Sequence, residues 1–249
     1  MKQENYIRGM IMIILSAFFF ACMNVSVRLA GDLPSVQKSF FRNLVAAFFA
    51  AIILIKNHTA PKVEKTQWGS LFLRCAFGTL GILCNFYAID HLLVADASIL
   101  NKLSPFFAII FSFLLLKEKI KPAQAMCVIL AFVGCLFVVK PGFENAHLIP
   151  ALIGVCGGLG AGIAYTMVRK MGTHGVKGPV IVFYFSCFSC IIVIPWIVFH
   201  YQPMSLRQLL TLLLAGLFAA GGQFTITAAY TYAPVSYTHL RAHETSLHL

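Results

Sequence analysis

Long apolar runs separated by short polar links dominate this sequence. The runs contain about 18 to 22 residues each, enough for a helix to cross a hydrocarbon core about 30 Å thick. The links carry Gly, Pro, Asn and charged residues, as turns between helices do. The pattern predicts eight membrane-spanning helices, at residues 9–29, 39–55, 69–89, 95–116, 123–139, 149–168, 180–199 and 209–229.

Composition places the chain in the same class. Hydrophobic residues make up 59% of the 249 residues, charged residues make up 11%, and the mean hydropathy is +0.85. A soluble domain has apolar and charged shares of about 45–50% and about 25%. We therefore expect an all-α, polytopic membrane protein with the lipid bilayer as its surroundings. The net charge of +11 comes from short cationic runs between the spans, so it does not indicate a nucleic-acid-binding face.

The distribution of cations predicts the orientation. If the N-terminus is cytoplasmic, eleven Lys and Arg residues fall on the inner side and five on the outer side. The inner group is Lys2, Arg8, Lys56, Lys62, Lys65, Lys117, Lys119, Lys121, Arg169, Lys170 and Lys177, and the outer group is Arg28, Lys38, Arg42, Lys140 and Arg207. Since cytoplasmic links carry the excess of cations, we predict a multi-pass protein of the inner (cytoplasmic) membrane with a cytoplasmic N-terminus.

An internal repeat appears when the chain is shifted by 141 positions. The shift places Val27 and Arg28 on Val168 and Arg169, and further matches are Gly31 with Gly172, Leu71 with Leu212, Phe77 with Phe218, Gly81 with Gly222 and Ala88 with Ala229. The first unit, 1–141, holds five predicted spans. Because five is odd, the second unit, 142–235, would insert upside down, as in many secondary transporters.

The second unit contains only three of its five expected spans, so we expect eight helices of a complete ten. The last segment, 236–249 (SYTHLRAHETSLHL), has three histidines and no apolar run of spanning length. We interpret it as a non-native tail and exclude its histidines from metal sites. A genuine polar terminus is the alternative.

Chemistry-bearing motifs are few. The eight cysteines all lie in apolar segments, and Cys187 and Cys190 have no second pair to complete a metal site. The sequence has no H-E-x-x-H motif and no paired carboxylates. We therefore predict no enzyme activity, no metal and no cofactor. A non-transporting scaffold or sensor and an inactive truncated fragment stay open as alternatives.

Several motifs together resemble the EamA-type drug/metabolite transporter superfamily. They are LLVADAS at 92–98, LSP at 103–105, LKEKI at 116–120, KPG at 140–142, and YAPVS at 232–236, which echoes the first corner. The resemblance implies ten helices in two inverted five-helix units. It also implies transport of a small metabolite, such as an amino acid or a related anionic compound, by alternating access without a cofactor. A homodimer is a further hypothesis.

Polar residues inside spans are the candidates for a substrate cavity: Asn24, Arg74, Asn85, Asn101, Lys102 and Gln223. Asn and Gln in spans also serve as hydrogen-bonding groups between helices. A Lys within an apolar span is costly, so Lys102 either extends to the membrane interface or faces a cavity. In the second case we expect it to contact the acidic group of the substrate.

Other polar and helix-breaking residues have more ordinary interpretations. Arg28, Arg42 and Arg169 lie at predicted span ends, where long side chains extend to the interface. Pro105 and Pro195 are expected to kink their helices. The glycines at 154, 158 and 162 have the spacing of close helix packing.

Overall fold

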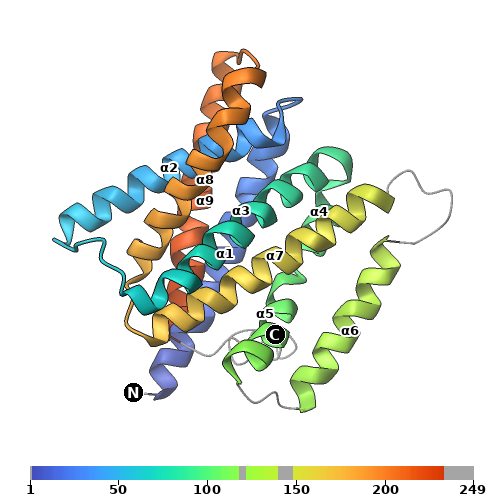
Figure 1. Cartoon of the computed structure of the whole chain (residues 1–249). Coiled ribbons are helices and arrows are strands. Elements are labelled where there is room, and N and C mark those ends of the chain that lie inside the picture. Colours follow the sequence, from blue (N-terminus) through green and yellow to red (C-terminus); the bar gives the residue numbers. More distant parts are fainter. Residues whose placement is uncertain (1, 118–121, 140–147, 233–249) are drawn as a thin grey trace.

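The fold is a bundle of long helices (Figure 1). The computed structural model describes residues 2–117, 122–139 and 148–232, and no strand occurs among them. The helices are α1 (Lys2–Leu29), α2 (Ser35–Lys56), α3 (Trp68–His91), α4 (Val94–Asn101), α5 (Ser104–Leu116), α6 (Pro122–Val139), α7 (Leu148–Thr173), α8 (Gly178–His200) and α9 (Leu206–Tyr232), with a short 3₁₀ turn η1 (Lys65–Gln67) before α3. The predicted all-α class is confirmed, and each predicted span except that at 95–116 falls on a single helix. The tail 236–249 lies outside the described residues.

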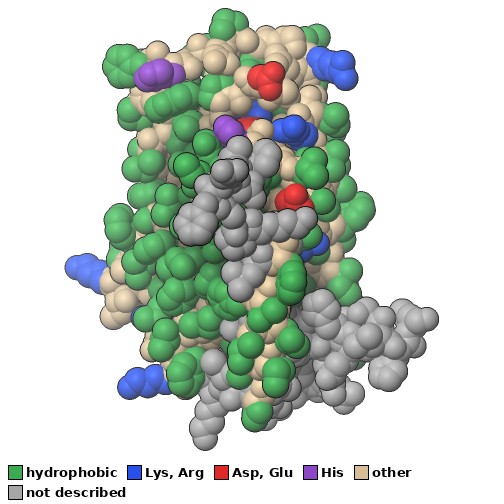
Figure 2. All heavy atoms as spheres, turned by 90° about the vertical axis from the view of Figure 1, so that its right-hand side faces the viewer, with side chains coloured by type: hydrophobic (Ala, Val, Ile, Leu, Met, Phe, Trp, Pro, Cys, Tyr) green, Lys and Arg blue, Asp and Glu red, His purple; other side chains and the backbone are tan. Residues whose placement is uncertain are grey.

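The bundle has an apolar exterior, and a set of polar side chains is buried among the apolar residues of its core. Seven helical stretches among the described residues are long and apolar enough to cross a membrane, against the eight predicted; the predicted span at 123–139, which is α6, is not among them. Large side chains such as Phe18 and Ile191 are 60% and 65% exposed, whereas Asn43 and Thr166 are fully buried. Hydrophobic side chains cover much of the face seen in Figure 2. This pattern suits a lipid surrounding, so the chain is a multi-pass membrane protein.

The predicted span at 95–116 is not one continuous helix, which corrects the sequence prediction. It consists of α4 and α5, which meet at Lys102 and Leu103. Pro105 lies in the first turn of α5. Its ring lacks an N–H and would clash with the carbonyl four residues earlier, so a helix continuing through it is disfavoured. Pro195, in contrast, lies inside an uninterrupted α8.

Two of the main helix pairings are related by an offset of 141 residues. The most extensive contacts join α1 to α9 and α3 to α7, and α2 packs along α8. Figure 1 shows α3 and α7 side by side. A shift of 141 residues places α1 on α7 and α3 on α9. The α1–α9 and α3–α7 contacts are therefore the same pairing with the two units exchanged.

One hydrogen bond recurs at the same offset. Arg28 Nη1 donates to the carbonyl of Ile89 over 2.9 Å, and Arg169 Nη1 donates to the carbonyl of Tyr230 over 3.3 Å. Both members of the second pair lie 141 positions after those of the first. In each case an arginine near the end of one helix, α1 or α7, donates to a carbonyl in the last turn of the helix two spans later, α3 or α9. The bond satisfies a carbonyl that the helix end leaves without an intrahelical donor.

The glycines of α7 permit close helix packing, as predicted. A Cβ on Gly158 would lie 2.9 Å from the carbonyl oxygen of Leu100, and one on Gly162 would lie 2.5 Å from Cβ of Phe107. On another side of α7, a Cβ on Gly160 would lie 2.9 Å from the carbonyl oxygen of Phe77. Absent side chains therefore let α7 approach α3, α4 and α5 closely.

Replacement of Gly162 by Ala is expected to destabilise the fold by about 1–3 kcal/mol, because the new Cβ meets Phe107 and nearby α5 backbone that cannot move aside cheaply. Gly134→Ala is the matched control, since nothing lies within 4 Å of its added Cβ. In this control, the higher helix propensity of Ala over Gly should stabilise α6 by about 1 kcal/mol. Thermal unfolding in detergent should separate the two variants. Equal melting temperatures would contradict this account of α7.

A buried ion pair joins the start of α2 to the end of α3. Lys38, whose side chain is 1% exposed, forms a salt bridge with Asp90, whose side chain is 19% exposed. Ser35 Oγ donates to the second carboxylate oxygen of Asp90 over 2.7 Å. The carboxylate thus offsets the charge of a lysine that has left water.

Candidate functional site

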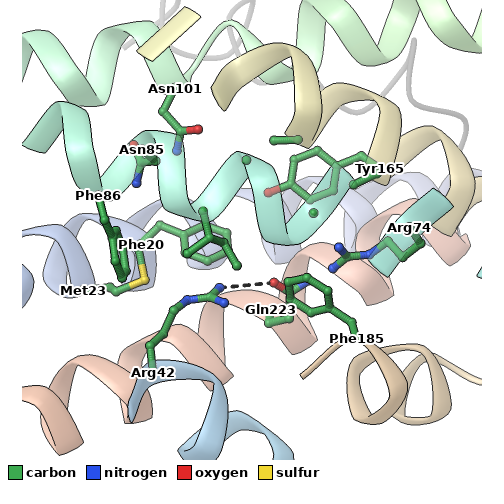
Figure 3. A pocket seen from close by; sticks show the side chains of 15 residues that line it. Phe20, Met23, Arg42, Arg74, Asn85, Phe86, Asn101, Tyr165, Phe185 and Gln223 are labelled. Carbon is green, nitrogen blue, oxygen red and sulfur yellow. Dashed lines mark hydrogen bonds between the residues drawn. The ribbon is translucent and has the colours of Figure 1, made fainter. Parts of the chain in front are cut away.

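A small cavity lies within the bundle, where side chains from both halves of the sequence converge (Figure 3). Its volume is about 50 Å³. The lining residues are Phe20, Met23, Arg42, Arg74, Gly78, Gly81, Ile82, Asn85, Phe86, Asn101, Ala161, Ala164, Tyr165, Phe185 and Gln223. They come from α1, α2, α3, α4, α7, α8 and α9.

One face of α3 forms a wall of this cavity. Arg74, Gly78, Gly81 and Asn85 follow one another at intervals of four, three and four residues, which puts them on one side of a helix. The wall therefore has a cation near one end, an amide at the other and two glycines between. Gly81 also packs against α7, where its Cβ would lie 3.1 Å from the carbonyl oxygen of Gly157.

Arg74 is 2% exposed, and its guanidinium is held against an aromatic ring. Its Cζ lies 3.9 Å from the ring centroid of Phe185 on α8, a cation–π contact. The guanidinium extends along α3 and occupies the space beside Gly78, where an added Cβ would clash with it. Gly78 thereby makes room for the charged group.

Arg42 approaches the same region from α2 and is 3% exposed. Its Nη1 donates to Asn43 Oδ1 over 2.6 Å, and its Nη2 donates to Gln223 Oε1 over 3.4 Å, the bond drawn in Figure 3. Its Cζ is 6.0 Å from the Phe185 centroid. Since Arg74 Cζ is 3.9 Å from that centroid, the two guanidinium carbons lie within about 10 Å of each other.

Several polar atoms around the cavity are buried without a hydrogen-bond partner. They are Nε of Arg42, Nε of Arg74, Oδ1 of Asn85 and Nε2 of Gln223. Buried polar atoms in folded proteins are almost always paired, so such a cluster needs an explanation. None of the residues that line the cavity is Asp or Glu. The arrangement suits a polar ligand that brings its own acceptors to the two arginines.

The structure brings together four of the six predicted site residues. Arg74, Asn85, Asn101 and Gln223 line the cavity. Asn24 is buried in α1, and its Nδ2 donates to Ser98 Oγ over 3.2 Å, so it joins α1 to α4 without lining the cavity. Lys102 is exposed at the α4–α5 break and does not line the cavity.

Arg42 requires a correction. The sequence placed it near the start of a span at 39–55 and predicted extension to the interface. The helix instead begins at Ser35, which places Arg42 about two turns inside it, and the side chain is buried. The polar residues Lys38, Ser39, Arg42 and Asn43 recur at helical spacing, and this stripe is the signal that the span start obscured. Tyr165 and Phe185 were missed because aromatic residues in spans carry no such signal.

Known proteins are similar to this sequence over most of its length. The model of the EamA-like transporter family matches residues 7–140. The pseudopaline exporter of Pseudomonas aeruginosa is 32% identical over 90% of this chain and 78% of its own length. The riboflavin transporter of Brucella anthropi is 25% identical over 88% and 79%. Human solute carrier family 35 member G1 is 27% identical over 89% and 64%.

Solved structures agree at the level of the fold. One crystal structure superposes with a TM-score of 0.69 over 96% of this chain and 89% of its own, at 12% sequence identity. That identity supports a common fold and nothing finer. The family match covers more than half of the chain, and the Pseudomonas relative exceeds 30% identity over most of its length. The bundle and its central cavity therefore belong to a member of the EamA-like transporter family.

Proposed function

We propose that this transporter moves a small metabolite with an acidic group and binds that group between Arg42 and Arg74. The single observation that carries the proposal is the pair of buried arginines that face one cavity without a carboxylate among its lining residues. This assigns to the arginines the role that the sequence suggested for Lys102. Amino acids and other anionic or zwitterionic metabolites belong to the substrate class.

Electrostatics favours an anion at this place. A charge removed from water costs several kcal/mol unless a partner of opposite sign offsets it. The planar guanidinium presents donors in a fork that matches a carboxylate or a phosphate. The uncompensated Nε atoms of both arginines are such donors. A ligand with an acidic group would satisfy them and offset their charge at once.

The arginines also connect the two units, 1–141 and 142–235, that we propose as the moving parts. Arg42 and Arg74 belong to the first unit, and their contacts, Gln223 and Phe185, belong to the second. An acidic ligand would compete for the same donors and weaken these contacts. Binding would thereby favour rearrangement of one unit against the other, as alternating access requires. The repeated arginine bonds at Ile89 and Tyr230 support the division into units.

The test is transport by the purified protein in liposomes. Each candidate acid is compared with its uncharged amide of the same carbon skeleton, so that only the charge differs. Riboflavin and pseudopaline join the panel because two relatives carry their names. We expect acids to be taken up and to compete with one another, and amides to do neither. Equal transport of acids and amides would overturn the proposed anion site.

We further propose an inner-membrane location with a cytoplasmic N-terminus, on the cation bias of eleven against five. Single cysteines introduced at Asn57 and Gly172 in a cysteine-free background should resist a membrane-impermeant thiol reagent in intact cells. The same cysteines should react after the membrane is opened. Labelling of either position from outside would reverse the assignment.

A further inference from the structure

We infer that Asn85 and Asn101 form a second recognition point, which selects substrates with an uncharged hydrogen-bonding group distant from the acidic one. The inference rests on the proposed anion site at Arg42 and Arg74 and adds a requirement that the anion site alone does not impose. It concerns the other end of the same cavity.

Asn85 is 4% exposed, yet its Oδ1 has no hydrogen-bond partner. It ends the α3 stripe that begins with Arg74. Asn101, half-buried, reaches the cavity from the last turn of α4. Helix α4 ends at this residue, because Pro105 disfavours a helix that continues through it. Figure 3 shows both amides on one side of the cavity, away from Arg74. Two uncharged amides from different helices thus reach the same cavity. The only charged side chains among its lining residues are the two arginines.

The spacing along α3 sets an upper limit on the distance between the two polar groups of the ligand. The Arg74 guanidinium lies beside Gly78, which precedes Asn85 by seven residues. At 1.5 Å per residue, those positions are roughly 10 Å apart along the helix axis. An acidic group and a second polar group at most roughly 10 Å apart would therefore reach both ends together.

The chemistry of the amides sets the nature of the second group. A carboxamide both donates and accepts hydrogen bonds but has no net charge. Besides the two arginines that bind the acidic group, the lining residues offer a second anion no cation. An ammonium group at this end, distant from the ligand's own acidic group, would find no carboxylate among the lining residues. A hydroxyl or an amide meets neither difficulty, and its loss would leave Asn85 unpaired.

Binding to the full chain in liposomes tests the inference with two series of linear acids. One series ends in a hydroxyl group, and the other, of matched length, ends in a methyl group. We expect the wild-type protein to prefer the hydroxy acid by about tenfold at the best length, the effect of one buried hydrogen bond. In Asn85→Leu that preference should fall below about threefold while binding of the methyl-ended acid is kept.

Further variants separate this inference from the anion site. Asn101→Ala, at a half-buried position, should reduce the preference even if Asn85→Leu fails to fold. Lys102→Ala is the neighbouring control and should keep the preference in full. Arg74→Leu should weaken binding of both series. Equal wild-type binding of the two series, or an unchanged preference in both Asn variants, would overturn only the second recognition point. Binding of neither acid by the wild type would overturn the anion site and this inference with it.

Discussion

Replacement of Arg74 by Leu is expected to reduce transport of an acidic substrate by about 100-fold. A hydrogen bond to a charged group contributes about 1.5–3 kcal/mol, and each 1.4 kcal/mol changes an affinity about tenfold. Arg74 is buried beside the cavity, so water cannot replace the lost donors. Arg74→Lys should retain part of the activity, because it keeps the charge but loses the planar fork and the contact with Phe185.

Initial rates of uptake into liposomes give the measurement, and melting temperature in detergent gives the control for folding. Arg74→Leu removes a buried cation whose Nε has no partner, so its thermal stability should be equal to or above that of the wild type. Lys102→Met, at an exposed site outside the cavity lining, should leave the rate within about twofold. Wild-type rates in Arg74→Leu, or an equal loss in Lys102→Met, would show that the arginine does not bind the acid.

Replacement of Asp90 by Asn is expected to destabilise the fold by about 3 kcal/mol. The change leaves Lys38 buried without a counter-charge, and breaking a buried ion pair on one side costs about 3–5 kcal/mol. We take the lower end of that range because the Asp90 side chain is 19% exposed, so water reaches this end of the ion pair. The α2–α3 junction should therefore open before the rest of the bundle.

The double variant Lys38→Met, Asp90→Leu provides the control, because replacing both charges with apolar groups of similar volume is often neutral. Ser35→Ala removes one hydrogen bond to Asp90 and should cost only about 1 kcal/mol. Melting temperatures should thus rank Asp90→Asn below Ser35→Ala, with the double variant near the wild type. A double variant as unstable as Asp90→Asn would contradict the account of the pair as charge compensation.

The sequence by itself determined the class, the approximate place of most of the spans and the family, but it predicted eight spans where seven described stretches qualify. Hydropathy could do this because in lipid each helix satisfies its own backbone, so a span is a local property of some 20 consecutive residues. The repeat at 141 positions was visible in the sequence, and the hydrogen bonds of Arg28 and Arg169 occur at that offset.

Only the tertiary structure decided which polar residues meet. Arg42 and Lys102 each lie a few residues inside an apolar run. A helix start four residues earlier than predicted turns Arg42 into the bundle, whereas the break before Pro105 leaves Lys102 exposed and Asn101 in the cavity. Whether a side chain faces a cavity depends on helix rotation and on neighbours far away in sequence, such as Gln223 for Arg42. Those distant contacts, unlike hydropathy, are not written in the local pattern of residues.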